Sequence, residues 1–113
     1  MKTKSQNQNQ KITSHYHDKR YKREEFIKEY LGGDGNIIDW FIVDRGHVGG
    51  TEKHCITDNG IIIIYNNETG RLITKLIARR GQIERLYKNR KIKPPQWLLE
   101  IADWHTDLGC NNK

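Results

Sequence analysis

The chain of 113 residues carries 20 Lys and Arg against 14 Asp and Glu, which gives a formal net charge of +6. This length allows one domain with a modest hydrophobic core and excludes a second core. The longest purely aliphatic run, Ile61–Ile64, is too short to span a membrane, and the polar first eleven residues show no signal-peptide pattern. We therefore expect a cytoplasmic protein that has no membrane partner.

The positive charge is concentrated in two blocks. Residues 1–23 and residues 79–93 each hold seven Lys or Arg and one acidic residue. Concentrated positive charge attracts polyanions through Coulomb energy and counterion release, so the blocks favour nucleic acid or another phosphate ligand. The alternative is a charged surface that only keeps the protein in solution.

Residues 1–14 are polar and low in complexity, so we expect a disordered basic arm ahead of a single α+β domain over residues 15–113. Apolar residues at helical spacing predict a helix over Lys19–Leu31, and the pair Gly32-Gly33 ends it.

An antiparallel meander of about four strands follows this helix. The strands are expected over Ile37–Asp44, Thr51–Thr57, Ile61–Tyr65 and Arg71–Arg79. Asn59-Gly60 joins the second and third strands and is a strong hairpin signal, which we interpret as a turn with both residues at positive φ. Four consecutive isoleucines in the third strand predict a central strand that is buried on both faces.

Alternation in the fourth strand predicts which residues share a face. One face is expected to hold Leu72, Thr74, Leu76 and Ala78, and the other Ile73, Lys75, Ile77 and Arg79.

Two helices complete the predicted α+β fold. The first covers Gly81–Lys88, and the second begins at Pro94-Pro95 and ends at Gly109. The apolar stripe of the last helix comprises Trp97, Leu98, Ile101, Trp104 and Leu108. The seven-residue spacing of the two tryptophans is typical of packing in a core or at an interface. Helices that stand apart from an antiparallel sheet in the chain are typical of the α+β class.

The first candidate site is the loop Arg45-Gly46-His47 together with Glu52, Lys53 and His54. Histidine is the usual general acid or base near neutral pH. If the flanking strands pair, His47 and His54 lie near the same edge of the sheet, where Arg45 or Lys53 would stabilise an oxyanion or a phosphorane. A polar surface turn is the alternative.

The second candidate site is a cationic strip at the fourth strand, made of Thr74, Lys75, Arg79 and Arg80. Such a strip follows a nucleic-acid backbone or holds one phosphate. An edge strand that charge protects from aggregation is the alternative.

Other patterns argue against cofactors and metals. Cys55 and Cys110 form no disulfide framework, and we expect free thiols in a reducing compartment. His15 and His17 lack a third metal ligand, and with Tyr16 they fit a basic-aromatic patch that stacks on bases better. The sequence has no Walker loop, dinucleotide fingerprint or nucleophile elbow. It also lacks acid clusters of the kind that hold magnesium in a two-metal nuclease, so any phosphodiester chemistry is expected to be metal-independent.

Three segments resemble small phage and prophage proteins of Gram-positive bacteria, which are similar to the barnase–EndoU–colicin–RelE (BECR) group of nuclease-like folds. They are Asp44-Arg45-Gly46-His47, the stretch from His54 to Asn66 with its Thr-Asp-Asn-Gly-Ile-Ile-Ile run, and Leu72–Arg79. The resemblance covers about residues 37–87. It implies cleavage of RNA rather than DNA without metal or other cofactor, by attack of the 2′-hydroxyl and formation of a cyclic phosphate, in the cytoplasm of a bacterial host cell.

The resemblance also implies roles for particular residues. His47 or His54 would act as base or acid, and Thr74 or Tyr65 would position the phosphate. The full set that it implicates is His47, His54, Thr74 and Lys75 in catalysis, and Arg45, Lys53, Tyr65, Arg79, Arg80 and Arg85 in phosphate or nucleic-acid binding.

Two non-catalytic functions remain open at this point. One is a phage inhibitor of a host protein or defence system, of the anti-CRISPR kind, with Trp97 and Trp104 of the C-terminal helix as anchors if they are exposed. The other is a nucleic-acid-binding accessory factor, which would show a steep salt dependence of binding.

Overall fold

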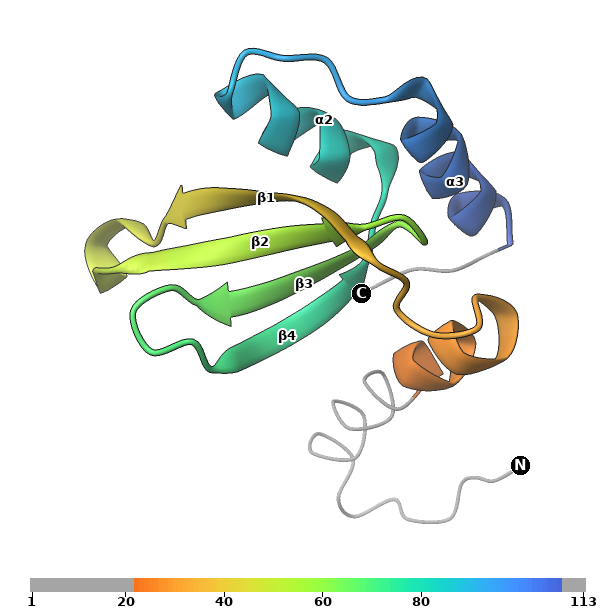
Figure 1. Ribbon diagram of the computed structural model, residues 1–113, viewed down its shortest axis with the longest axis horizontal. Helices are drawn as coiled ribbons and strands as arrows, with labels where there is room; N and C mark the ends of the chain where they lie inside the picture. Colours follow the sequence, from red (N-terminus) through yellow and green to blue (C-terminus); the bar gives the residue numbers. More distant parts are fainter. Residues whose placement is uncertain (1–21, 109–113) are drawn as a thin grey trace, which may run out of the picture.

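The computed structural model describes residues 22–108. Residues 22–30 form the N-terminal helix, which is followed by β1 (Ile37–Asp44), the 3-10 helix η2 (Gly46–Val48), β2 (Thr51–Thr57), β3 (Ile61–Asn66), β4 (Leu72–Ile77), α2 (Arg80–Asn89) and α3 (Gln96–Asp107). Figure 1 shows α2 and α3 together on one side of the sheet, and the N-terminal helix at the end of the sheet away from η2. The α+β class and the order of elements are confirmed.

The four strands form one antiparallel sheet in the order β1-β2-β3-β4, so each strand pairs with its neighbours in the sequence. β3 lies inside the sheet, and its four isoleucines, Ile61 to Ile64, are all buried. The expectation of a central strand buried on both faces is therefore confirmed.

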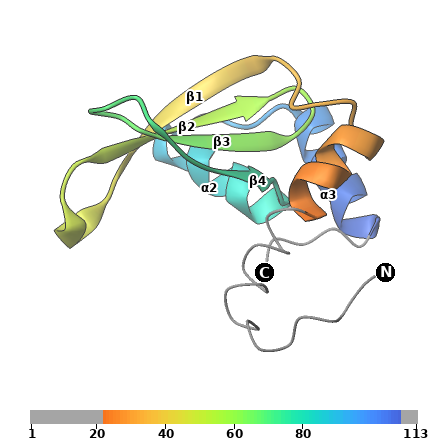
Figure 2. The same ribbon diagram turned by 90° about the horizontal axis from the view of Figure 1, so that it is seen from below.

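Two separate hydrophobic clusters cover the two faces of the sheet. On the face toward α2 and α3, which we term the covered face, Ile62 and Ile64 pack with residues such as Leu86 and Leu98. On the opposite face, Ile61 and Ile63 pack with Ile27 of the N-terminal helix. Because that helix is short and stands at one end of the sheet (Figure 2), it covers only part of this second face.

The rest of the second face lies open to solvent. We define the open face by Trp40, Ile42, Lys53, Tyr65 and Leu72, which the strand register places on the side of Cys55 and Ile63. Trp40, Ile42 and Leu72 are exposed, with Trp40 at 49% of its surface, and the Lys53 ammonium lies 5.0 Å from the centre of the Trp40 ring. The open face is thus apolar, with one lysine near its centre.

A β-bulge changes the expected alternation in β4. Thr74 pairs with Ile64 but Leu72 pairs with Tyr65, so the register shifts between them. Leu72 therefore shares the open face with Lys75 instead of lying on the side of Thr74 and Leu76. The prediction for this residue was wrong, because an extra residue in one strand reverses the faces beyond it.

The β2–β3 hairpin forms as expected, but with a different turn. Gly60 is at φ +78° and donates its N–H to the carbonyl of Thr57 at 3.0 Å, whereas Asn59 is not at positive φ. This is the three-residue loop in which a left-handed glycine follows a simple turn. Asn59 is held by its side-chain amide, which donates to the carbonyl groups of Leu31 and Gly33 beyond the N-terminal helix.

Of the two positions that the spacing of the α3 tryptophans allowed, the structure excludes the core. Trp97 and Trp104 are 45% and 47% exposed, because the buried side of α3 consists of Leu98, Leu99, Ala102 and His105. His105 is 1% exposed and its ring lies edge-on to Phe26 at 6.3 Å between centroids. Neither of its ring nitrogens makes a hydrogen bond of good geometry.

We expect Gly60→Ala to destabilise the fold by about 3 kcal/mol, from the left-handed backbone and from overpacking. An added Cβ would lie 2.8 Å from His105 Cε1 and 2.9 Å from Ile101 Cγ2. The matched control is Gly46→Ala, at φ +70° with nothing within 4 Å, which should cost only the backbone term of about 1–2 kcal/mol. Urea unfolding measures both, and equal losses would contradict the close packing at Gly60.

Burial lowers the pKa of His105 below its ordinary value of 6.5, while the backbone of Ala78 and of Asn59 acts in the opposite direction. The unfolded chain therefore binds a proton more readily than the folded one. Stability from this residue is present above pH 6.5 and is lost as the pH falls below that value. We expect His105→Gln to reduce the slope of unfolding free energy against pH between about 5 and 7, by up to about 1.4 kcal/mol per pH unit.

Candidate active site

Glu52 and His54 form a hydrogen-bonded pair on β2. They are two residues apart on one strand, so both side chains lie on the covered face, and His54 Nε2 is 2.9 Å from Glu52 Oε1. Because a carboxylate can only accept, Nε2 donates its N–H to Oε1, and in the neutral ring this tautomer leaves Nδ1 as the acceptor. The pair has the arrangement in which a histidine acts as general base and a carboxylate orients it.

Arg45 is the third member of this group. Its Nε lies 3.7 Å from Glu52 Oε2, so the carboxylate stands between a guanidinium and an imidazole. All three side chains are partly buried, with relative exposures between 16% and 31%. The orientation of the Glu52 carboxylate is therefore set by two charge-assisted contacts.

A cleft of about 220 Å³ lies beside His54, between the sheet and α2. Its lining residues are Val43, His54, Ile62 and Leu76 from the sheet, and Gln82, Arg85, Leu86 and Asn89 from α2. Gln82, Arg85 and Asn89 are three and four residues apart and so lie on one face of the helix. The cleft combines an apolar floor with one imidazole, one guanidinium and two amides.

The volume of this cleft limits its ligand. Pockets for drug-sized molecules usually measure about 300–1,000 Å³, so 220 Å³ suits a smaller ligand or one part of a larger one. Within residues 22–108, no three His, Cys, Asp or Glu side chains are grouped so that they could hold a metal ion. The chemistry that the cleft offers is proton transfer by His54 and stabilisation of negative charge by Arg85.

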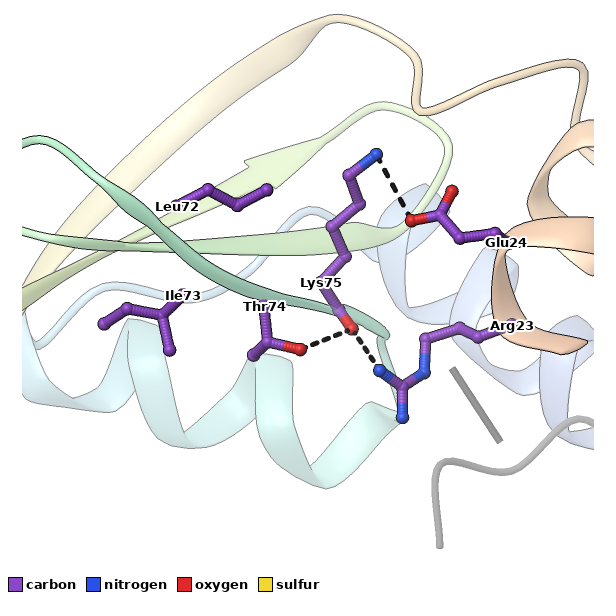
Figure 3. A pocket seen from close by; sticks show the side chains of 6 residues that line it. All are labelled: Arg23, Glu24, Leu72, Ile73, Thr74 and Lys75. Atoms are coloured by element: carbon purple, nitrogen blue, oxygen red, sulfur yellow. Dashed lines mark hydrogen bonds and ion pairs between the residues drawn. The ribbon is translucent and has the colours of Figure 1, made fainter. Parts of the chain in front are cut away.

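Thr74 and Lys75 do not join the cleft. Thr74 lies on the covered face, separated from His54 by Ile64 of β3, which pairs with both. It lines a smaller cavity of about 70 Å³ at the outer side of β4, together with Arg23 and Glu24 of the N-terminal helix (Figure 3).

Lys75 points to the other side of the sheet from Thr74 (Figure 3). It forms two ion pairs, of which Figure 3 shows the one with Glu24. Its ammonium lies 2.9 Å from Asp34 and 3.6 Å from Glu24. The hydrogen bond to Asp34 raises the pKa of Lys75, although partial burial opposes the shift. Lys75 therefore ties β4 to the N-terminal helix and to the segment that follows it.

Two further predicted ligands of phosphate, Lys53 and Tyr65, lie on the open face and so on the opposite side of the sheet from His54. Cys55, a buried free thiol, lies beside them, and its pKa is raised by burial, which Lys53 partly opposes. Cys110, His15, Tyr16 and His17 and the predicted arm over residues 1–14 lie outside the described residues.

Arg79 and Arg80 lie at the start of α2. The backbone N–H of Arg79 donates to Gln82 Oε1 at 2.9 Å, and its Nε is buried without a partner within the described chain. Arg80 forms a bidentate ion pair with Asp103 of α3, in which Nη2 lies 2.8 Å from Oδ2. It forms a second ion pair with Glu84. This hydrogen bonding to Asp103 raises the pKa of Arg80 and lowers that of Asp103. Arg80 thus connects two helices.

His47 is exposed in η2, at the tip of the β1–β2 hairpin. No hydrogen bond or ring contact connects it with His54, which pairs with Phe41 and Ile64 in the middle of the sheet. Of the residues that the sequence suggested, the structure brings Arg45, His54 and Arg85 to one region. It leaves the others elsewhere.

Sequence reasoning missed Gln82 and Asn89 as cleft residues. Their spacing relative to Arg85 places the three on one side of a helix, and this signal was readable in the sequence. That this side faces His54, however, depends on how α2 crosses the sheet.

Comparisons with protein-family models, with curated proteins and with solved structures return no match. The resemblance to the BECR group therefore stays a prediction.

Proposed function

We propose that this protein cleaves RNA without a metal ion, at the cleft between the sheet and α2. The observation that supports the proposal is the Glu52–His54 pair, with its 2.9 Å contact, at the wall of a cleft that also contains Arg85. A histidine oriented by a carboxylate beside a guanidinium is the minimum set for moving a proton at a phosphodiester.

In this mechanism His54 Nδ1 takes the proton of a ribose 2′-hydroxyl as its oxygen attacks the adjacent phosphorus. The bond from phosphorus to the 5′-oxygen of the next nucleotide breaks, and that oxygen takes a proton from solvent in the open cleft. The products are a 2′,3′-cyclic phosphate and a free 5′-hydroxyl. Glu52 stabilises the imidazolium that forms, and Arg85 stabilises the charge on the phosphorane oxygens.

The two basic blocks supply attraction for a long polyanion, which a cleft of this size alone does not. In the second block Arg80 and Arg90 are paired with Asp103 and Asp39, whereas no ion pair is formed by Arg85 within the described residues. Arg85 is therefore the residue through which RNA affinity and catalysis are coupled.

The nuclease proposal predicts that the full chain cleaves total RNA in the presence of EDTA. We expect His54→Ala to reduce the rate at least about 100-fold, because general acid–base catalysis contributes about 10²–10⁴. Glu52→Gln should reduce it less and shift its pH profile, since it keeps the hydrogen bond but removes the charge that stabilises the imidazolium. His47→Ala is the matched control and should keep full activity.

Three results would count against the nuclease. These are no cleavage by the wild type, equal cleavage by His54→Ala, or loss of activity only in His47→Ala. No cleavage with salt-sensitive RNA binding would favour the accessory factor. Absence of both cleavage and binding would favour the inhibitor of a host protein.

A further prediction concerns how the affinity for RNA depends on salt concentration. Each phosphate contact contributes about −0.7 to the slope of log affinity against log salt for single strands. We expect Arg85→Ala to reduce the steepness by about that amount. Arg80→Ala should reduce it less, since Asp103 already neutralises the Arg80 charge, and a larger effect of Arg80→Ala would contradict the assignment.

A further inference from the structure

One side of α3 carries an apolar stripe that the described chain leaves largely exposed, although Ile101 within it also packs against the β2–β3 turn at Gly60. We define the outer stripe as Trp97, Ile101, Trp104 and Leu108, of which all but Ile101 are at least 45% exposed. The spacings of four, three and four residues place them in one line along the helix. Half-exposed tryptophans are the residues most often found as energetic anchors in protein interfaces.

The charges on α3 restrict what binds there. The helix carries Glu100, Asp103 and Asp107 and no Lys or Arg, in a chain whose net charge is +6. Asp103 is paired with Arg80, but Glu100 and Asp107 are exposed beside the outer stripe. Nucleic acid is repelled by this surface, and pairing of two α3 helices along their outer stripes would bring like charges together.

The open face is the second uncovered apolar surface of the described chain. Trp40, Ile42 and Leu72 on it are exposed. Its central charge is the ammonium of Lys53. A sheet face and an amphipathic helix are complementary in shape, and in this protein the covered face and α2 already pack in that way. The acidic side chains of α3 and the lysine of the open face also carry charges of opposite sign.

Both edges of the sheet are occupied by arginine side chains. Arg23 Nη1 donates to the carbonyl of Lys75 on β4 at 2.8 Å (Figure 3), and Arg90 Nη1 donates to the carbonyl of Trp40 on β1 at 3.3 Å. Arg90 also lies over the Phe41 ring at 4.3 Å. These contacts disfavour association by extension of the sheet, so the open face is the surface of the sheet on which another chain can pack.

We propose that a second copy of this chain covers both surfaces. In a symmetric dimer, the outer stripe of each α3 lies across the open face of the other protomer, so two identical contacts form. Glu100 and Asp107 then approach Lys53 of the other copy. This assembly is independent of the nuclease proposal, because the cleft beside His54 is on the covered face.

The area available is of the size that a stable dimer needs. A fully buried aromatic side chain hides about 150–250 Å², so each half-exposed tryptophan still offers about 100 Å². Each protomer contributes three such tryptophans together with Ile42, Leu72 and Leu108. The sum is roughly 500–600 Å² per protomer, near the lower end of the range for a standard interface, and flanking polar side chains add to it.

The test is the oligomeric state of the full chain, measured by sedimentation equilibrium between about 1 and 100 μM. We expect a monomer–dimer equilibrium. Ile42→Lys on the open face and Trp104→Lys on the outer stripe should each raise the dissociation constant at least about thirty-fold, the effect of losing a strong interface anchor. Both positions are half-exposed, and far-UV circular dichroism with thermal unfolding verifies that the variants fold. Glu29→Gln, which adds the same sign of charge at an exposed position away from both surfaces, should leave the constant unchanged.

A mixture of the two lysine variants distinguishes this arrangement from other dimers. Each variant alone lacks both contacts, but a heterodimer of the two keeps one intact contact, between the α3 of Ile42→Lys and the open face of Trp104→Lys. The mixture should therefore dimerise at concentrations where each variant alone is monomeric. A monomeric wild type at 100 μM would overturn the proposal and leave these surfaces to a different protein. A dimer that only one variant disrupts, or that mixing fails to restore, would overturn it as well.

Discussion

The four buried isoleucines of β3 impose the constraint on which the rest of the structure depends. Because their side chains alternate between the two faces, both faces of the sheet have to be shielded from water at the same strand. α2 and α3 supply the cover on one side and the N-terminal helix supplies it on the other. A two-layer protein needs cover on only one face. This chain therefore builds a third, partial layer from one short helix.

Because the helices cover the two faces of the sheet unequally, the proposed active-site cleft and the proposed dimer surface lie on opposite faces. Where α2 packs along the sheet, the polar side of the helix meets the polar end of the covered face, and the cleft beside His54 forms there. Where the N-terminal helix does not reach, Trp40 and Ile42 remain in water. The same strand, β2, contributes His54 to the first region and Lys53 to the second, because neighbouring residues in a strand point to opposite sides.

Ion pairs within the fold determine which cationic side chains are free to contact a ligand. The sequence predicted that Lys75 and Arg80 are parts of one cationic strip. In the fold each of them connects two elements through ion pairs with acidic residues. Arg90 holds β1 in the same way, through Asp39 and the ring of Phe41. A count of positive charges along the chain therefore overstates the positive surface that RNA would meet. Paired side chains have less to gain from a phosphate.

The sequence by itself determined the fold class, the order of elements and the central position of β3, because hydrophobic periodicity and turn residues are local signals. It also grouped Glu52 and His54 in one candidate site. Only the tertiary structure decided which polar groups face one another. The bulge in β4 moved Leu72 to the open face, and the packing of α3 through Leu98 and His105 left both tryptophans outside. The crossing of α2 brought Arg85 to His54 and left His47 at a distant hairpin. These outcomes depend on register and helix packing, which are set by contacts between residues far apart in the chain.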